Sequence, residues 1–289
     1  MSENLAELRR GYAEEIGRLA GVTWRPIVEA FAAVPREAFA GPGPWKIYDA
    51  GLQPRLIPDG DPSPLYANVL ISLDEAKNLN NGQPQFWAWL FERLIPTVGE
   101  RVIHVGAGGG YYTAILAEMV GPTGSVTGIE FEPELAARAA ASLVDRPNVE
   151  VLAGDAHALA RGAADIIVAS CGFDAVPAAW ARLLAEGGRL LVPLTAGSAY
   201  PGIGGGALLL VTRRGDAYDA RFVGSTMIYH DMSGRSKAAT RRLAQALPPL
   251  EPDKPWRAPE IASLRIGTPP DETCWLAGEG WWISTAPNP

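Results

Sequence analysis

Hydrophobic and polar positions divide the middle of the chain into short apolar runs, separated by segments with helical periodicity. The apolar runs predict five strands, at residues 101–105, 125–129, 149–152, 165–169 and 190–193. The intervening segments predict helices at residues 111–120, 133–143 and 177–184. Because strands that alternate with helices at this spacing form parallel, doubly wound sheets, the pattern predicts an α/β fold.

The chain before this region is expected to be helical first and irregular afterwards. Residues 5–19 and 23–33 have amphipathic patterns that predict two helices. Residues 41–66 are rich in glycine and proline, which predicts an irregular surface segment. A short strand at residues 66–73 and a helix at residues 85–94 are expected next.

After residue 200 the pattern changes to that of an antiparallel β structure. We expect two strands joined through Gly215, one helix, a proline-rich linker and a final group of short strands that packs on the main domain. In order, these segments are residues 207–213, 220–228, 237–247, 248–259, 261–266 and 274–284.

A glycine-rich turn follows the first of the five strands. Residues 106–110 read Gly-Ala-Gly-Gly-Gly, and Glu130 ends the next strand, 24 residues (130 − 106) after the first glycine. Strand, glycine turn, helix, strand and acid form one nucleotide-binding half, in which the acid accepts hydrogen bonds from ribose hydroxyls. Tyr111 stands where a dinucleotide-binding turn has its third glycine, which argues against NAD and favours a smaller nucleoside such as S-adenosylmethionine.

Other polar or small residues lie at the carboxyl ends of the predicted strands. Asp155 follows the third strand and Ser170 follows the fourth. Parallel sheets bind ligands beyond these ends, so both residues are expected at one edge with the glycine turn and Glu130.

Composition and charge narrow the function classes. The net charge of −7 predicts no nucleic-acid partner, and no apolar run reaches the roughly 18 residues that a membrane helix needs. The first 15 residues are charged, without the apolar centre of a signal peptide. Cys171 and Cys274 provide neither a disulfide framework nor metal-ligand spacing. We therefore expect a cytoplasmic protein without a metal; the oligomeric state cannot be inferred.

Several motifs along the chain resemble those of the protein-L-isoaspartate carboxyl O-methyltransferase family, a branch of the S-adenosylmethionine-dependent methyltransferases. The resemblance covers roughly residues 10–215, and its order and spacing are specific. The matching motifs are VPREAF at 34–39, HVGAGGGYYTAILAE at 104–118, GIE at 128–130, GDA at 154–156, DIIVAS with VP at 165–177, and GGRLLVPL at 187–194.

The resemblance implies a role for each matched position. Gly106, Gly108 and Gly110 would shape the turn against the methionine part of S-adenosylmethionine, and Glu130 would hold its ribose. Asp155 and Ala156 would contact the adenine. The predicted cofactor contacts also include His104, Ala107, Tyr111, Phe131 and Ser170.

A loop before the first strand resembles the family's Ser-x-Pro element, which lies over the reacting methyl group. Here it reads Gly82-Gln83-Pro84, and with Asn81 it is the predicted acceptor-positioning loop. The family serine is absent, which suggests that Asn80, Asn81 or Gln83 provides polar contacts to a different acceptor. His104 stands where the family has an acid, and we favour a hydrogen-bonded histidine over a catalytic one.

Together these observations predict a Rossmann-like methyltransferase fold with a central, mostly parallel sheet flanked by helices. Residues 1–77 would form an N-terminal helical and irregular extension, residues 78–215 the cofactor-binding domain, and residues 216–289 a C-terminal appendage with short strands and one helix. Domains of this size are common.

The expected reaction is methyl transfer to an oxygen, on a peptide, protein or small-molecule carboxylate. A carboxylate is ionised at neutral pH and needs no general base, which suits a chain with only three histidines and no recognisable nucleophile–base pair. His230-Asp231 is the one local candidate base, and a surface turn is the simpler interpretation. Two alternatives remain: a catalytically silent relative that only binds, and a nicotinamide-dependent oxidoreductase.

Overall fold

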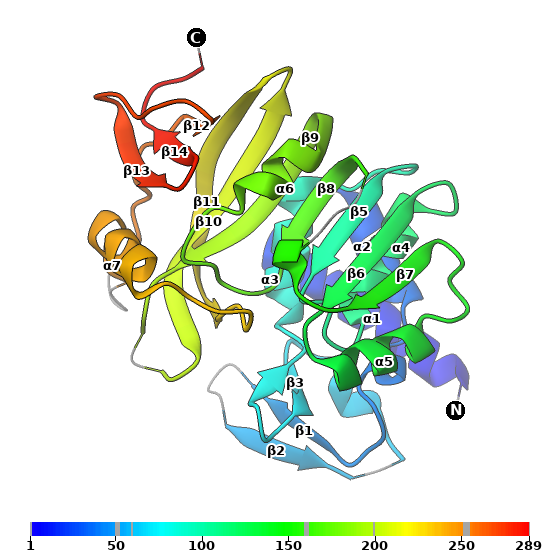
Figure 1. Ribbon diagram of the computed structural model, residues 1–289. Helices are drawn as coiled ribbons and strands as arrows, with labels where there is room; N and C mark the ends of the chain where they lie inside the picture. The colour runs from blue at the N-terminus through cyan, green and yellow to red at the C-terminus, as the bar shows by residue number, and fades with distance from the viewer. Residues whose placement is uncertain are drawn as a thin grey trace. The chain divides into compact units, whose positions relative to one another are not determined.

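The computed structural model describes residues 2–49, 53–58, 60–158, 162–198, 200–250 and 255–288 (Figure 1). The chain forms two compact units. The first consists of Met1–Arg101 with Ala107–Gly154, and the second of Val102–Gly106 with Asp155–Pro289. Among the described residues, no helix has both the length and the apolar character to cross a membrane.

The first unit has five helices, and the first four of them surround an aromatic core. They are α1 (Ser2–Ala20), α2 (Arg25–Ala33), α3 (Pro84–Leu94), α4 (Tyr111–Val120) and α5 (Pro133–Ser142). Helix α2 packs against α1, α3 and α4, and the rings of Phe31, Phe91, Tyr111 and Tyr112 meet between them. Aromatic rings bury large apolar areas, so this cluster fixes α4, the helix that follows the glycine turn.

The segment predicted to be irregular surface, residues 41–66, is instead part of a folded sheet. Its strands are β1 (Trp45–Tyr48), β2 (Pro54–Ile57), β3 (Leu70–Asp74) and β4 (Leu79–Asn80), in the order β2-β1-β3-β4. Trp45, Ile47, Ile57 and Leu65 are buried with Ile71 in one cluster. Two buried positions in the alternation of β1 carry the strand signal, which the surrounding glycines and prolines obscure. A short 3₁₀ turn at Arg36–Phe39 precedes β1, and another at Ser63–Leu65 lies between β2 and β3.

Two parallel strands of the first unit carry the predicted ribose acid. Strand β6 (Ser125–Glu130) pairs in parallel with β7 (Val149–Ala153), and Glu130 lies opposite Ala153. Helix α5 packs against both strands.

The strands of the second unit are parallel at first and antiparallel afterwards. Strands β5 (Arg101–Val105), β8 (Ala164–Ala169) and β9 (Leu184–Thr195) are parallel. The antiparallel strands are β10 (Ile203–Arg214), β11 (Ala217–Tyr229), β12 (Ser263–Ile266), β14 (Trp281–Ser284) and β13 (Cys274–Gly278), in this order across the sheet (Figure 1). The helices are α6 (Ala178–Leu183) and α7 (Lys237–Ala246), with a 3₁₀ turn at Ala156–Ala158.

Parallel strands flanked by helices confirm the predicted Rossmann-like α/β fold, and the tail strands are packed as expected. Strand β9 begins at Leu184, before the predicted start at residue 190, and contains a register shift: Leu184 pairs with Ala164, and Arg189 pairs with Ile166. Residues 251–254 of the predicted linker lie outside the described residues, and the domain boundaries at residues 77/78 and 215/216 stay predictions.

Candidate functional site

The turn between β5 and α4 has a backbone conformation that only glycine adopts readily at three positions. The φ angle is +76° at Gly106, +55° at Gly108 and +90° at Gly110. Residues with a Cβ rarely adopt such angles. At the fourth glycine, Gly109, an added Cβ would lie 2.8 Å from the carbonyl oxygen of Phe39. Backbone geometry and close packing therefore explain the glycines of this turn.

Two residues that the sequence singles out separately are in direct contact. The carboxylate of Glu130 accepts a hydrogen bond from the backbone N–H of Gly108, with Oε2 2.6 Å from the nitrogen. Its other oxygen accepts from the N–H of Glu132 at 3.0 Å. Burial raises the pKa of Glu130 above its ordinary value, and these two N–H donors oppose that shift. A buried carboxylate therefore lies against the glycine turn.

The neighbours of these residues differ in exposure. Ala107 and Tyr111 are buried, and the Ala107 N–H donates to the carbonyl of Ile129 at 3.0 Å. Phe131 follows Glu130 and is 42% exposed, so its ring is accessible to a ligand. His104 is buried in β5, where burial lowers its pKa to about 3. Its imidazole is therefore neutral at neutral pH.

Hydrogen bonds from Tyr112 and to the loop's own asparagine side chains hold the predicted acceptor loop. Gly82 has φ +74°, and the hydroxyl of Tyr112 donates to its carbonyl oxygen at 3.0 Å. The backbone N–H of Gly82 donates to the Asn80 side-chain oxygen at 2.8 Å. The Asn81 side-chain oxygen accepts from the N–H of Ile71 at 2.8 Å. Gln83 precedes α3 as its N-cap residue and is partly exposed.

The remaining predicted site residues belong to the second unit. The carboxylate of Asp155 accepts from the N–H of His157 at 2.8 Å, which shapes the turn after β7. The carbonyl of Ala156 accepts from the indole N–H of Trp180 at 3.1 Å. The Ser170 hydroxyl donates to the carbonyl of Val105 at 2.9 Å and also contacts that of Gly106. Each predicted residue here is thus tied to the loop or strand end around it.

The structure also contains a pair that sequence reasoning missed. The imidazole Nε2 of His157 lies 3.0 Å from Oδ2 of Asp231, 74 residues away in the chain. The hydrogen bond to Asp231 raises the pKa of His157 above its ordinary value. Asp231 also accepts from the N–H of Ser233 two residues on, at 3.2 Å, which agrees with the turn favoured for His230-Asp231 over a catalytic base. Two residues so far apart in sequence give no local signal of their contact.

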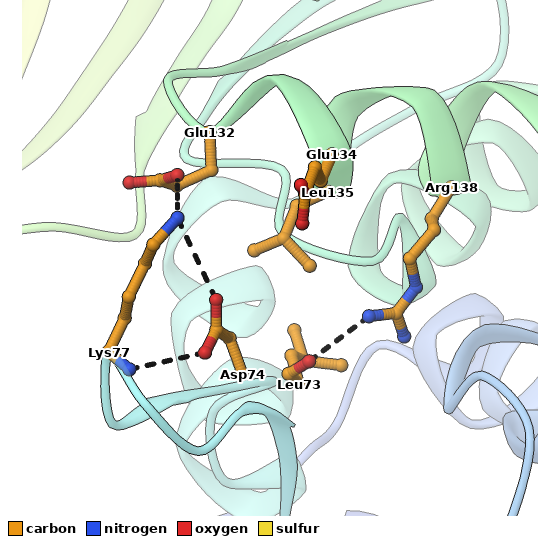
Figure 2. Close-up of a pocket in the computed structure, with 7 residues that line it drawn as sticks. All are labelled: Leu73, Asp74, Lys77, Glu132, Glu134, Leu135 and Arg138. Carbon is orange, nitrogen blue, oxygen red and sulfur yellow. Dashed lines mark hydrogen bonds and ion pairs between the residues drawn. The ribbon is translucent and has the colours of Figure 1, made fainter.

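A pocket of about 280 Å³ lies between β3 with its following turn and the start of α5 (Figure 2). Lys77 forms an ion pair with Glu132 and lies 3.7 Å from the Asp74 carboxylate. Arg138 donates to the carbonyl oxygen of Leu73 at 3.0 Å. Lys77 is thus paired with two acids of the lining, and none of the predicted site residues lines this pocket.

These residues suit binding better than acid–base catalysis. The two oxygens of Glu130 can accept further hydrogen bonds from ligand hydroxyls, because each carboxylate oxygen has two lone pairs. No group of three or more His, Cys, Asp or Glu side chains within the described part of the chain is placed to hold a metal ion. The arrangement can hold a ligand with hydroxyl groups at Glu130. The neighbouring glycine turn lacks side chains, so such a ligand can approach its backbone closely.

Comparison with known families identifies related proteins. The model of the protein-L-isoaspartate(D-aspartate) O-methyltransferase family matches residues 61–201. Protein-L-isoaspartate O-methyltransferase 2 of Anaeromyxobacter sp. is 34% identical over 193 residues, which are 64% of this chain and 69% of that protein. The protein-L-isoaspartate O-methyltransferase of Pyrobaculum neutrophilum is 32% identical over 217 residues, 73% of this chain and 92% of that protein.

Solved structures show the same fold. One protein-L-isoaspartate O-methyltransferase superimposes with a TM-score of 0.65 at 21% identity, covering 83% of this chain and 71% of that one. A Plasmodium falciparum β-aspartate methyltransferase in complex with S-adenosyl-L-homocysteine gives 0.59 at 16% identity, covering 77% and 97%. At these identities the structural likeness concerns the fold alone.

Proposed function

Because this chain belongs to the protein-L-isoaspartate(D-aspartate) O-methyltransferase family, we propose that it transfers a methyl group from S-adenosylmethionine to a carboxylate oxygen of a peptide, protein or small-molecule acceptor. The observation that carries this proposal is the contact between Glu130 and Gly108. It joins the acid and the glycine turn, and both lie within the segment that matches the family.

The described residues fit the cofactor. Glu130 would accept hydrogen bonds from the ribose hydroxyls, since its carboxylate is buried and keeps lone pairs beyond those used by Gly108 and Glu132. The turn from Gly106 to Gly110 would face the methionine part. Asp155 and Ala156 would contact the adenine. S-adenosylmethionine supplies a methyl group activated by its sulfonium.

A carboxylate acceptor suits a site in which no histidine is placed to act as a general base. It is already ionised at neutral pH, so no base has to remove a proton, and positioning contributes most of the rate. His104 is buried and neutral, and His157 is engaged with Asp231. The loop of Asn81, Gly82 and Gln83 would position the acceptor, as its resemblance to Ser-x-Pro suggests.

Transfer of labelled methyl from S-adenosylmethionine tests the proposal. The acceptors are an isoaspartyl peptide, its aspartyl twin and a set of small carboxylic acids, with S-adenosylhomocysteine binding measured on the same sample. We expect base-labile methyl ester on at least one carboxylate. Cofactor binding without ester formation on any of them would indicate the catalytically silent relative, and no cofactor binding would refute the proposal as a whole.

We infer a cytoplasmic location from the cysteines. Cys171 and Cys274 are the only two in the chain and both are free thiols. Free thiols are typical of proteins from reducing compartments.

A further inference from the structure

The turn between β3 and β4 is joined by charge to the segment that follows Glu130. This turn covers residues 75–78, and the N–H of Asn78 donates to the carbonyl oxygen of Glu75 at 3.2 Å. Asn78 has φ +55°, a left-handed conformation that asparagine tolerates better than most residues. From this turn the ammonium group of Lys77 forms its ion pair with the Glu132 carboxylate (Figure 2).

The cavity of about 280 Å³ described above separates this turn from the start of α5. Two polar contacts cross the gap: the ion pair of Lys77 with Glu132, and the hydrogen bond from Arg138 to the carbonyl oxygen of Leu73 (Figure 2). Protein interiors are normally close-packed. Because side chains do not fill this gap, the two polar contacts have a larger share in fixing the turn than they would have in a packed contact.

Glu132 influences the predicted ribose acid in two ways. Its backbone N–H donates to a carboxylate oxygen of Glu130 at 3.0 Å, and its side chain places a second negative charge near that buried acid. Burial is the main cause that raises the pKa of Glu130, and the charge of Glu132 acts in the same direction. A cation paired with Glu132 therefore fixes a hydrogen-bond donor to Glu130 and offsets an unfavourable charge beside it.

The same hairpin also covers the glycine turn. A Cβ built on Gly108 would lie 3.3 Å from Leu73 Cδ1, and one built on Gly109 would lie 3.4 Å from Leu73 Cδ2. The N–H of Gly108 is the second donor to the Glu130 carboxylate. The hairpin thus contacts both segments that supply these N–H groups, the glycine turn through Leu73 and the start of α5 through Lys77.

We propose that Lys77 is a positioning residue for S-adenosylmethionine binding, because its ion pair with Glu132 keeps the β3–β4 hairpin against the two segments whose N–H groups orient Glu130. This inference rests on the proposed function, in which Glu130 accepts from the ribose hydroxyls. Lys77 acts through Glu132 and Glu130. Its side chain is 42% exposed, and ion pairs with exposed partners stabilise only weakly, so the expected effect is modest.

The test is a double-mutant cycle on the affinity for S-adenosylhomocysteine, measured by isothermal titration calorimetry. It compares wild type, Lys77→Met, Glu130→Ala and the double variant Lys77→Met/Glu130→Ala. Methionine keeps most of the length of the lysine side chain and removes its charge. Thermal unfolding of each variant is measured in parallel, to separate a binding defect from a folding defect.

Lys77→Met should weaken binding about threefold to fivefold. In the Glu130→Ala background the same change should cost less than about twofold, because the acid through which Lys77 acts is gone. Glu132→Gln keeps the backbone N–H and breaks the ion pair, so it should reproduce the loss seen in Lys77→Met. An equal loss with and without Glu130 would overturn the inference, as would unchanged affinity in a folded Lys77→Met protein.

Lys46→Met is the matched control. Lys46 in β1 forms an ion pair with Glu75 of the same hairpin turn, with 2.9 Å between Nζ and Oε2. This variant removes a lysine–glutamate pair that does not involve Glu132, and its affinity should stay within about twofold of wild type. Lys77→Arg keeps the charge and should retain most of the affinity. Equal losses in Lys46→Met and Lys77→Met would point to general loosening of the hairpin and contradict a specific role of Lys77.

A second measurement needs no ligand. Amide hydrogen exchange at Glu132, followed by NMR in the free protein, reports how well its N–H is held against Glu130. Lys77→Met should speed this exchange about threefold, and Lys46→Met should leave it unchanged. Weaker cofactor binding with unchanged exchange at Glu132 would overturn the positioning role.

The inference and the proposed function fail in different ways. A wild-type protein that binds no S-adenosylhomocysteine would refute both. Binding with the expected cycle but without ester formation on any carboxylate would refute methyl transfer and leave the role of Lys77 standing. Methyl transfer by the wild type, together with unaltered cofactor affinity in Lys77→Met, would refute the role of Lys77 alone.

Discussion

The carboxylate of Glu130 lies 2.6 Å from the backbone nitrogen of Gly108, so the acid at the end of β6 and the centre of the glycine turn share one hydrogen bond. The acid thus has a structural role in the protein alone. It holds the turn in place before any ligand is bound. A substitution at either residue is therefore expected to alter the position of the other.

Replacing Glu130 with alanine should weaken S-adenosylhomocysteine binding by about 1.5–3 kcal/mol, the range for hydrogen bonds to a charged group. Glu130→Gln keeps one oxygen to accept from an N–H and should lose less. Isothermal titration calorimetry on both variants measures the difference. Equal affinity in wild type and Glu130→Ala would remove this residue from the cofactor site.

Gly108→Val should abolish cofactor binding and lower stability. The φ angle of +55° costs a residue with a Cβ about 1–2 kcal/mol of stability. The added Cβ would also lie 3.3 Å from Leu73 Cδ1, and the valine methyl groups extend beyond it. Gly11→Val is the matched control, because Gly11 lies in α1 and, apart from the backbone of its own helix and its chain neighbours, no atom lies within 4 Å of a Cβ there. Urea unfolding and a cofactor titration should separate the two variants, and a Gly108→Val protein that still binds would mean that the turn does not face the cofactor.

Gly82→Ser does not restore the family hydroxyl in this chain. The φ angle of +74° and the 2.6 Å approach to Trp87 should destabilise the variant by about 2–4 kcal/mol, from backbone strain and overpacking. Phenylalanine at residue 87 shortens the ring edge. The double variant Gly82→Ser/Trp87→Phe should therefore be more stable than the sum of the single effects by at least about 0.5 kcal/mol. If the changes in unfolding free energy of Gly82→Ser and Trp87→Phe add up in the double variant, residues 82 and 87 are not in contact.

The His157–Asp231 pair should make stability depend on pH. The pKa of His157 is raised from its ordinary 6.5, first by the hydrogen bond that its imidazole donates to Asp231, with the charges of Asp155 and Asp174 acting in the same direction. A group with a raised folded pKa stabilises the protein below its unfolded pKa, and the contribution is lost as the pH rises through the folded pKa.

The acidic limit of this window follows from Asp231. Its pKa is lowered from the ordinary 3.8 by its hydrogen bonds to His157 and Ser233, which outweigh burial, so its contribution is present above 3.8. The advantage of wild type over Asp231→Asn in unfolding free energy should therefore be largest between about pH 4.5 and 6.5 and shrink toward pH 8. An advantage that is flat from pH 5 to 8 would contradict the charged pair.

The strands and helices around the glycine turn were predictable because their signals are local. Residues 101–130 contain an apolar run, a glycine-rich turn at residues 106–110 and an acid at Glu130, in the spacing of a nucleotide-binding half. The sheet at residues 45–74 was not predictable in this way. Its short strands take their stability from burial against Leu65 and Ile71, which are distant in sequence from β1.

The acceptor loop shows the other limit of sequence reasoning. The sequence reveals that a serine is missing at residue 82, but the tryptophan that fills its place is five residues further, on the opposite side of Pro84. From the sequence, a tryptophan in an amphipathic helix is predicted to be a core residue. Only the folded structure shows that the N–H edge of Trp87 lies beside Gly82. The roles of individual site residues stay predictions for the same reason.

The two units interleave along the chain, which has a consequence for the order of folding. Val102–Gly106 belongs to the second unit, while the residues before and after it belong to the first. Strand β5 finds its parallel partner β8 only about 60 residues later, since Val102 pairs with Ile166. During synthesis, β5 therefore emerges well before β8 and cannot form its parallel pairing until β8 has been synthesised. A fragment cut after Gly154 would keep β5 without β8, so neither unit can be produced alone by a single cut in the chain.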